Sequence, residues 1–302
     1  MKRLNSAAPP LSIGMPVYNG ANFIAVAIDS ILGQTFGDFE LIVSDNCSTD
    51  ETPAIVREFA AKDPRVRFHR NAINQGASRN FNIAFELSRG KYFKWAAHDD
   101  FLESSYLQAC IEPLEADPSI SLAHSGVRRI DERGFEIELL DLREHLGDRQ
   151  RTRRFRAALE SHDVSAIFGV MRRETLEKIP LMRDTNSDTL LLAEVLLRGE
   201  SHFDERILFN WRIHPECFRE SAFKSDAERR SWWSPELKRR PLGETLRILR
   251  MGGGAILRTP LSPVETVDCI RHCLRWAARP LLRRAPRRNG PLELRRDARA
   301  LR

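Results

Sequence analysis

Four short segments in the first hundred residues gather the polar side chains that could do chemistry. They are residues 16–20, 45–50, 74–80 and 98–100. In them, the Asp45 carboxylate can accept an N–H of a nucleobase, the Tyr18 ring can stack on a base, and Arg79 can pair with phosphate. Asp99 and Asp100 are adjacent carboxylates, which can hold a hard divalent cation. If the fold brings these segments together, their side chains could bind a base, a phosphate and a divalent cation.

Each segment lies where a predicted strand ends or a predicted helix begins. Apolar runs predict four strands, at residues 11–15, 39–44, 66–69 and 91–97. Helical spacing of apolar residues predicts the three intervening helices, near residues 22–31, 50–61 and 77–88. This alternation predicts a parallel sheet covered by helices on both faces. Such sheets bind ligands at the carboxyl ends of their strands, so the four segments should converge on one rim.

The regular alternation stops after residue 117. Apolar runs and turn residues predict four more strands, at residues 121–130, 135–139, 167–171 and 206–211. One apolar helix is expected at 187–198, because Ser187 can cap its start and Gly199 can end it. The second half therefore adds strands and one long helix to the first.

The C-terminal part of the chain differs in charge from the rest. Residues 238–302 carry 17 Lys and Arg against 5 Asp and Glu, whereas the preceding residues carry 31 against 37. An acidic body argues against a nucleic-acid-binding core. The basic tail either meets an anionic surface such as a membrane or presents the arginines between residues 271 and 288 as a solvated face. Within this part, residues 252–254 are three glycines, which predict a flexible joint. A helix with arginines beside its apolar face is expected at 264–282.

Several features bear on where the protein acts. The first ten residues lack the apolar stretch of a secretory signal, and no run of 18 uncharged apolar residues occurs. The five cysteines are odd in number and scattered, which is typical of reduced thiols. We expect Cys269 and Cys273 to share one helix face rather than to bind metal. These features predict a cytoplasmic protein, at most peripheral on the inner face of the membrane.

Four sequence stretches, in this order and spacing, resemble the family 2 glycosyltransferases. They are SIGMPVYNG, QTFGDFELIVSDNCSTDET, NQGASRNFNIAF and GKYFKWAAHDD, within a similarity that covers about residues 10–215. The resemblance implies inverting enzymes with the GT-A nucleotide-diphosphosugar transferase fold, an α/β fold whose mostly parallel central sheet is flanked by helices. We expect an N-terminal tail, a nucleotide-binding half, an acceptor half and a basic helical C-terminal extension, at residues 1–9, 10–117, 118–234 and 235–302 respectively.

The resemblance also assigns the residues that would bind the donor. Pro16, Tyr18 and Asp45 would hold the nucleobase, with the Asp45 carboxylate facing an N–H of uracil or thymine. Asn19 and Arg79 would lie near the ribose and the phosphates. The donor is therefore expected to be a UDP-sugar or a dTDP-sugar.

Asp99 and Asp100 match the end of the family's D-x-D-type motif. By that resemblance, one carboxylate contacts the ribose and the other binds Mg²⁺ or Mn²⁺ beside the diphosphate, with Asp100 and Asp99 as the metal residues. Many relatives carry a further aspartate where this chain has Ala97, so we expect a lower affinity for the metal. His98 is a candidate contact, but histidines line many clefts without binding metal.

The catalytic base is expected from the second half, because the donor half faces the leaving group. The stretch that begins at Ser187 resembles the segment that supplies an aspartate at the start of a helix, which here is Asp188. A helix N-terminus favours an ionised carboxylate, so Asp188 could take a proton from the acceptor hydroxyl. The alternative is that Asp188 only supports the start of the helix. His214 could close over the diphosphate or metal, or could be a structural histidine in a turn.

Together, these features predict a hexosyl or deoxyhexosyl transferase that moves a sugar to an acceptor hydroxyl. The basic tail favours a saccharide or lipid-linked acceptor in the assembly of a cell-surface polysaccharide or glycolipid. One alternative is a non-catalytic sugar-nucleotide-binding or scaffold protein, which the alanine at position 97 suggests. Another is a sugar nucleotidyltransferase, which would want a glycine-rich loop with Lys or Arg where residues 16–19 read PVYN.

Overall fold

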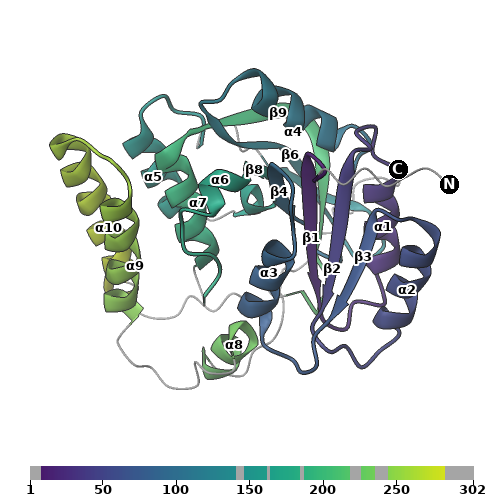
Figure 1. Cartoon of the computed structure of the whole chain (residues 1–302). Coiled ribbons are helices and arrows are strands. Elements are labelled where there is room, and N and C mark those ends of the chain that lie inside the picture. Colours follow the sequence, from purple (N-terminus) through teal and green to yellow (C-terminus); the bar gives the residue numbers. More distant parts are fainter. Residues whose placement is uncertain are drawn as a thin grey trace, which may run out of the picture.

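The computed structural model describes most of the chain, namely residues 8–140, 146–161, 164–183, 187–217, 226–234 and 244–282. Within them, nine strands form one sheet with helices on both faces (Figure 1). The strand order is β3-β2-β1-β4-β8-β6-β9-β5, and β7 pairs with β6 outside this path. The α/β fold predicted from the sequence is confirmed.

The first four strands form the parallel part of the sheet. They are β1 Leu11–Val17, β2 Phe39–Asp45, β3 Val66–Arg70 and β4 Tyr92–Trp95. The last residue of β1, Val17, pairs with Asp45 at the end of β2, and Asp45 pairs with Arg70 at the end of β3. These three strands therefore end at one level, the lower edge in Figure 1. Since β1 lies between β2 and β4, the loops that follow the strands share one rim.

Helices cover both faces because the strand side chains alternate between two cores. In β1, Leu11, Ile13, Met15 and Val17 all face one core, which includes apolar residues of α1 Ile24–Leu32, α2 Thr52–Lys62 and α4 Tyr106–Ala116. In β4, Phe93 and Trp95 face the opposite core, which includes residues of α3 Ala77–Glu86, α5 Arg151–Glu160 and α7 Ser187–Arg198. The sheet is thus the middle layer of three.

The second half of the sheet is mixed. Its strands are β5 Phe101–Leu102, β6 Ile120–Ile130, β7 Glu136–Leu140, β8 Val170–Arg172 and β9 Glu200–Arg212. The 3₁₀ helix η1 Ser165–Phe168 precedes β8 in the chain, and the short helix α6 Arg173–Leu176 follows it. Strand β8 is antiparallel to β4 and β6, and β9 is parallel to β6. The parallel order is continuous from β1 to β4, and β6 and β9 run in the same direction as these strands, with antiparallel β8 inserted between β4 and β6. A short turn joins β6 to β7, and such a turn permits only antiparallel pairing.

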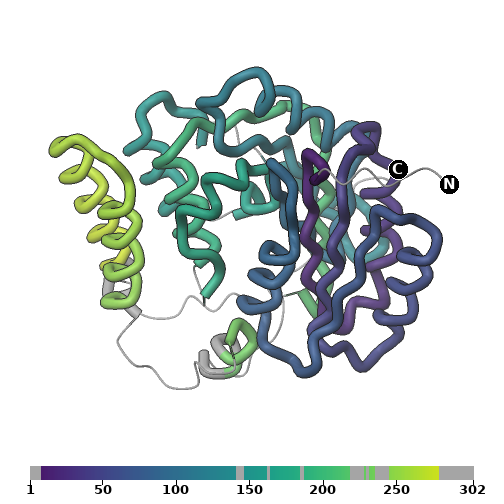
Figure 2. Tube along the Cα trace, in the orientation of Figure 1, coloured from purple at the N-terminus to yellow at the C-terminus, as the bar shows by residue number. Residues whose placement is uncertain are grey.

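The C-terminal helices are part of the molecule's packing. They are α8 Asp226–Trp233, α9 Glu244–Arg258 and α10 Pro263–Leu282, and the last two pack side by side against α5 and α7 (Figure 2). The Arg151 guanidinium donates two hydrogen bonds to the Glu265 carboxylate, at 2.6 and 2.8 Å. Arg258 donates to both oxygens of buried Glu194, at 3.1 and 2.8 Å. The domain boundary at residue 235 stays a prediction.

The predicted flexible joint at the three glycines is wrong. Residues 252–254 lie inside helix α9, and Gly252 is buried. A Cβ atom on Gly252 would lie 2.3 Å from the Cys273 sulfur of α10, so glycine there permits close contact between the two helices. Cys269 and Cys273 are buried on one face of α10, as predicted. None of the helices in the described parts of the chain is both long and apolar enough to span a bilayer.

Two neighbouring alanine substitutions should separate helix packing from flexibility. Gly252→Ala forces an atom against Cys273, and such overpacking costs about 1–3 kcal/mol of unfolding free energy. Gly253→Ala meets no atom within 4 Å, and it should stabilise the helix by up to about 1 kcal/mol. Urea denaturation of both variants measures the difference. Equal changes in the free energy of unfolding of the two variants would contradict the close contact between Gly252 and Cys273. A more stable Gly252→Ala variant would contradict it as well.

Candidate functional site

Hydrogen bonds join the loops after β1 and β2 into one unit. The Asn46 N–H donates to the Val17 carbonyl at 2.8 Å, which continues the pairing of the two strands. The Asn19 N–H donates to Ser48 Oγ at 2.9 Å, and Asn19 Oδ1 accepts the Thr49 N–H at 2.8 Å. Asn19 has a φ of 52°, a conformation that asparagine tolerates better than most residues. The position of Asn19 is therefore set by the second loop.

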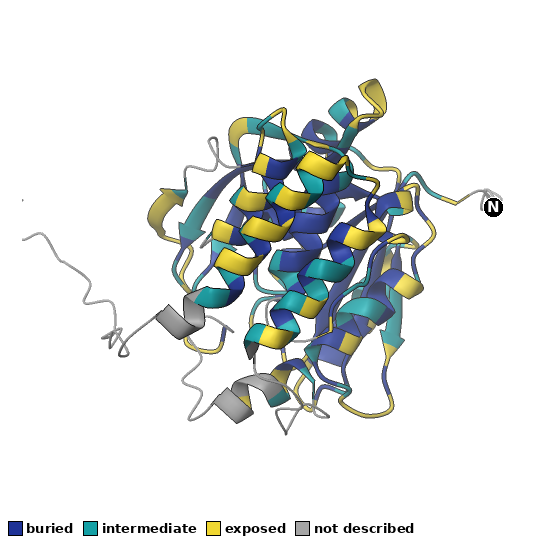
Figure 3. Cartoon of the chain, turned by 90° about the vertical axis from the view of Figure 1, so that its left-hand side faces the viewer, coloured by how far each residue is buried: buried dark blue, intermediate teal, exposed yellow. Residues whose placement is uncertain are grey.

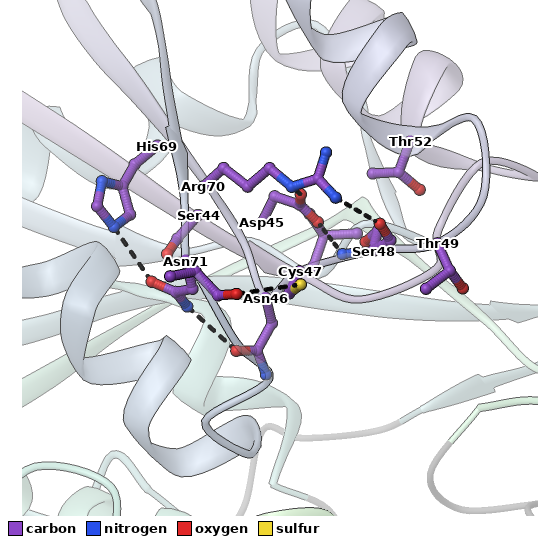
Figure 4. Close-up of polar contacts among 12 residues, drawn as sticks. Ser44, Asp45, Asn46, Cys47, Ser48, Thr49, Thr52, His69, Arg70 and Asn71 are labelled. Carbon is purple, nitrogen blue, oxygen red and sulfur yellow. Dashed lines mark hydrogen bonds and ion pairs between the residues drawn. The ribbon is translucent and has the colours of Figure 1, made fainter.

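Asp45 is wholly buried at the centre of this unit (Figure 4). Its Oδ1 accepts the Ser48 N–H at 3.0 Å, and its Oδ2 lies 3.3 Å from Arg70 Nε without a hydrogen bond. Arg70 also donates to the Ser48 carbonyl at 2.9 Å. Arg70 was not singled out in the sequence, although its place at the tip of β3 beside Asp45 is the signal. Contact between Asp45 and a nucleobase stays a prediction, and Arg70 would have to move for it.

Buried amides connect the second loop to the start of α3. Asn46 Oδ1 accepts the Asn71 side-chain N–H at 3.1 Å and the Gln75 backbone N–H at 2.9 Å. Asn71 also donates to Asn80 Oδ1 at 3.0 Å, and the Asn80 side chain donates to the Ser44 carbonyl at 2.7 Å. Figure 4 shows the hydrogen bond from the Asn71 side chain to Asn46. This network fixes the N-terminus of α3 beside the loop that carries Asp45.

The other predicted donor residues lie in different surroundings. Pro16 is buried within β1 opposite Ser44, and Tyr18 is exposed at the tip of its loop. Arg79 is exposed on α3, where its guanidinium donates to Glu86 Oε1 at 2.6 Å. Glu86 is the last residue of α3, so Arg79 reaches along the helix away from the rim. Its contact with phosphate stays a prediction and needs a different rotamer.

The acidic pair after β4 is held by the end of β9. The Arg212 backbone N–H donates to Asp100 Oδ1 at 2.9 Å, and its Nε donates to the Asp99 carbonyl at 2.9 Å. His214 Nε2 lies 3.0 Å from Asp99 Oδ2, and its ring packs on Phe23 with centroids 4.8 Å apart. The structure therefore brings together Asp99, Asp100 and His214, as their assignment to one site requires.

Burial and neighbouring charges separate the two carboxylates. Burial opposes ionisation of Asp99, but the charge of His98 and the hydrogen bond with His214 outweigh it and lower the Asp99 pKa. Burial and the negative charge of Asp99 raise the pKa of Asp100 well above its ordinary value. The hydrogen bond from the Arg212 N–H lowers this pKa, but by less than the other two effects raise it. One carboxylate is thus ionised readily, and its neighbour favours a proton or a cation.

The site can accommodate a divalent cation if the substrate supplies part of its shell. Asp100 Oδ2 is buried and has no hydrogen-bond partner in the parts of the chain that the structure describes. Within the described residues, no group of three or more His, Cys, Asp or Glu side chains converges as a metal centre. Two carboxylates fit Mg²⁺ or Mn²⁺ when phosphate oxygens and water complete the coordination. His98 packs on the first loop, since a Cβ on Gly20 would lie 2.3 Å from His98 Cδ2.

Two buried basic residues near Asp99 and Asp100, namely Arg212 and Lys94, were not singled out in the sequence. The Arg212 guanidinium stacks on Phe23 at 4.7 Å and donates to the carbonyls of residues 131 and 132 at 3.2 and 3.0 Å. Lys94 is fully buried and donates to the Phe168 carbonyl, with its ammonium 4.8 Å from the Tyr106 ring centroid. Burial lowers the Lys94 pKa to about 8. A lysine inside an apolar strand was the available signal.

Asp188 lies in the first turn of α7 and is partly buried. Its Oδ1 accepts the Thr189 N–H at 2.7 Å, and burial raises its pKa above the ordinary value despite that bond. The segment before α7 is tied to α3, because the Asn82 amide exchanges hydrogen bonds of 2.7 and 3.0 Å with the Met182 backbone. The start of α7 thus lies on the same side of the molecule as the strand ends (Figure 1).

Solved structures of two glycosyltransferases share this fold. The structure of S. aureus TarS in complex with UDP-GlcNAc superposes with a TM-score of 0.66 and 16% identity, covering 89% of this chain and 72% of that one. Mannosyltransferase PcManGT from Pyrobaculum calidifontis, in complex with GDP-Man and Mn²⁺, gives 0.51 and 17%, covering 91% and 75%. The α/β fold is therefore of the GT-A type.

Sequence comparison leads to the family. Chondroitin synthase of Escherichia coli is 36% identical over 126 residues, which are 42% of this chain and 18% of that protein. An uncharacterized glycosyltransferase of Rickettsia felis is 28% identical over 239 residues, 77% of this chain and 39% of that protein. The chain thus spans less than half the length of these relatives. The model of the Glycosyl transferase family 2 matches residues 12–180, more than half of the chain. The chain therefore belongs to glycosyl transferase family 2.

Proposed function

We propose that the protein is an inverting glycosyltransferase that moves a sugar from a UDP-sugar or dTDP-sugar to an acceptor hydroxyl with the help of Mg²⁺ or Mn²⁺. The observation that carries the proposal is the pair Asp99 and Asp100 at the rim, with Asp100 Oδ2 buried and without a hydrogen-bond donor among the described residues. A buried carboxylate oxygen without a donor favours a proton or a cation, and a divalent cation would satisfy it in the ionised form. The pair lies beside the loops that are expected to bind the donor nucleotide.

Asp99 and Asp100 would hold the cation, with phosphate oxygens of the donor completing its shell. When bound, the cation would neutralise charge on the departing diphosphate. His214 keeps Asp99 Oδ2 in place through its 3.0 Å contact, and Arg212 keeps Asp100 Oδ1 in place. Arg212 at the end of β9 and His214 just beyond it would thus orient the carboxylates before the donor arrives.

Asp188 would act as the general base. Burial raises the pKa of Asp188. Its ionised carboxylate is therefore a stronger base than an ordinary aspartate and takes a proton from a hydroxyl more readily. The hydrogen bond from Asn82 of α3 to the Met182 carbonyl supports a place for the start of α7 near the donor half. Attack on the anomeric carbon from the side opposite the diphosphate would invert its configuration in one displacement.

The acceptor is proposed from a named relative, and the place of action is proposed from the cysteines. The relative named chondroitin synthase supports polysaccharide synthesis, and we extend this to a saccharide or lipid-linked acceptor in a cell-surface polysaccharide or glycolipid. All five cysteines are free thiols, which supports a cytoplasmic protein. A reaction in the cytoplasm would also give access to nucleotide-sugars.

A thermal-shift screen tests the donor. UDP-sugars and dTDP-sugars with Mn²⁺ should raise the melting temperature, since a ligand at 100 times its Kd adds about 2.7 kcal/mol to the folded state. Chelation of the metal should remove most of the shift. GDP-mannose is the comparison, because the carboxylate of Asp45 is expected to select uracil or thymine. A larger shift with GDP-mannose than with every UDP-sugar and dTDP-sugar would refute the donor assignment.

A further inference from the structure

The outer face of helices α9 and α10 is an exposed apolar surface. Of 13 large hydrophobic residues exposed within the described parts of the chain, six lie on these two helices. They are Leu246, Leu257, Val264, Val267, Ile270 and Leu274. Figure 3 shows both helices from outside, with exposed residues along them. We call these six residues and the exposed arginines between them the outer face.

Helical spacing places these residues on one side of each helix. In α10, Val267 is followed by Ile270 and Leu274 at intervals of three and seven residues, which brings all three onto one stripe. Their exposed fractions are 56%, 44% and 51%. The opposite side of α10 carries buried Cys269 and Cys273, which pack in the core with α5 and α7. The helix is therefore apolar on two sides, and only one of them is covered within the described residues.

Positive charge accompanies the exposed stripe. Arg271 and Arg275 are exposed on α10 beside Val267 and Leu274, and Arg250 is exposed on α9. Asp268 is the acidic neighbour, and it accepts a hydrogen bond from Arg271 at 2.7 Å. The sequence after residue 282 continues with eight arginines and two acidic residues. A partner of this face should therefore combine an apolar layer with negative charge.

We propose that the outer face of α9 and α10 docks on the surface of an anionic lipid bilayer. The apolar stripe would enter the boundary between headgroups and acyl chains, and the arginines would meet lipid phosphates, as in interfacial amphipathic helices. A second copy of the chain fits less well, because a symmetric contact would place arginines of one copy against those of the other. This inference is independent of the donor, the metal and the catalytic base.

Sedimentation with lipid vesicles tests the docking. The full chain should sediment with vesicles of phosphatidylcholine and phosphatidylglycerol and much less with phosphatidylcholine alone. Val267→Asp combined with Leu274→Asp should weaken binding to the anionic vesicles at least about tenfold, because two apolar side chains no longer enter the bilayer. The test variant places both new charges on one stripe of α10.

The matched control is Val26→Asp combined with Leu139→Asp. Val26 on α1 and Leu139 on β7 are 50% and 53% exposed, close to the values for the test pair, and the change in charge is identical. This control should sediment like the parent, and circular dichroism should show that both variants are folded. Equal losses in both variants, or no preference of the parent for anionic vesicles, would overturn the proposal. So would a dimer of the parent in light scattering that only the α10 variant dissociates.

Discussion

Replacing Asp188 with Asn will reduce sugar transfer by roughly 10²–10⁴-fold while leaving donor binding almost unchanged, because an amide cannot accept the proton of the acceptor hydroxyl. The Asn side chain has the same shape, and its oxygen can still accept the Thr189 N–H, which the carboxylate does at 2.7 Å. Initial rates with donor in excess give the loss, and a titration of the nucleotide gives the affinity.

Two further variants separate the base from a support of the helix. If Asp188 only stabilises the start of α7, Asn should transfer sugar normally and Asp188→Ala should lower the melting temperature. If it is the base, both variants should be inactive. Glu200→Gln, an exposed acid just beyond α7, removes a charge without touching the site and should keep full activity. Near-normal transfer by Asp188→Asn would refute the assignment.

The raised pKa of Asp188 gives a second readout from the same variant. In the folded protein, burial makes the ionised carboxylate unfavourable, so at neutral pH the parent should lose stability relative to Asp188→Asn. As the pH falls below the ordinary pKa of an aspartate, the carboxyl is protonated in both states and the difference should vanish. The transfer rate should fall with decreasing pH through the raised pKa, since only the ionised form can take a proton.

Replacing Asp100 with Asn should remove the metal-dependent part of donor affinity, by roughly 10²-fold or more. The variant keeps an oxygen for the Arg212 N–H but loses the negative charge whose free Oδ2 is expected to bind the cation. Calorimetric titration of UDP with Mn²⁺ and with chelator measures the effect. Without metal, the parent and the variant should bind UDP with similar affinity.

Stability should change in the opposite direction from affinity. Burial and the charge of Asp99 raise the pKa of Asp100, so an uncharged Asn should leave the metal-free protein at least as stable as the parent at neutral pH. Asp38→Asn, an exposed aspartate before β2, is the control for charge and should alter neither quantity. An unchanged difference between the Mn²⁺ and chelator titrations in Asp100→Asn would exclude it as a metal residue.

Local patterns in the sequence determined the first half of the fold. The four predicted strands and three helices appear in β1 to β4 and α1 to α3, with ends that differ by a few residues. Parallel order follows from the alternation of strands and helices, and it places the polar loops on one rim. Helix α7 and helix α10 were also predicted, because their apolar spacing is regular.

Long-range packing decided what the sequence could not. The three glycines indicated a joint because glycine favours flexibility locally, but they lie inside α9, where Gly252 packs closely against Cys273 of α10. The directions of β8 and β9 depend on pairing with strands far away in sequence, β4 and β6 for β8 and β6 for β9. Such choices leave no periodic signal in the chain.

The sequence by itself determined which polar residues follow the strands, and the tertiary structure decided the partner and direction of each side chain, so that Glu86 draws Arg79 away from the rim. The acidic pair, Asp45 and Arg79 were identified from their loops, yet Arg70, Glu86 and Arg212 became their partners only through folding. The physical reason is that a side chain's type and its place on a strand or helix are local properties. Its ionisation and hydrogen bonds depend on residues far away in sequence, such as Arg212, whose backbone N–H meets Asp100 across 112 positions.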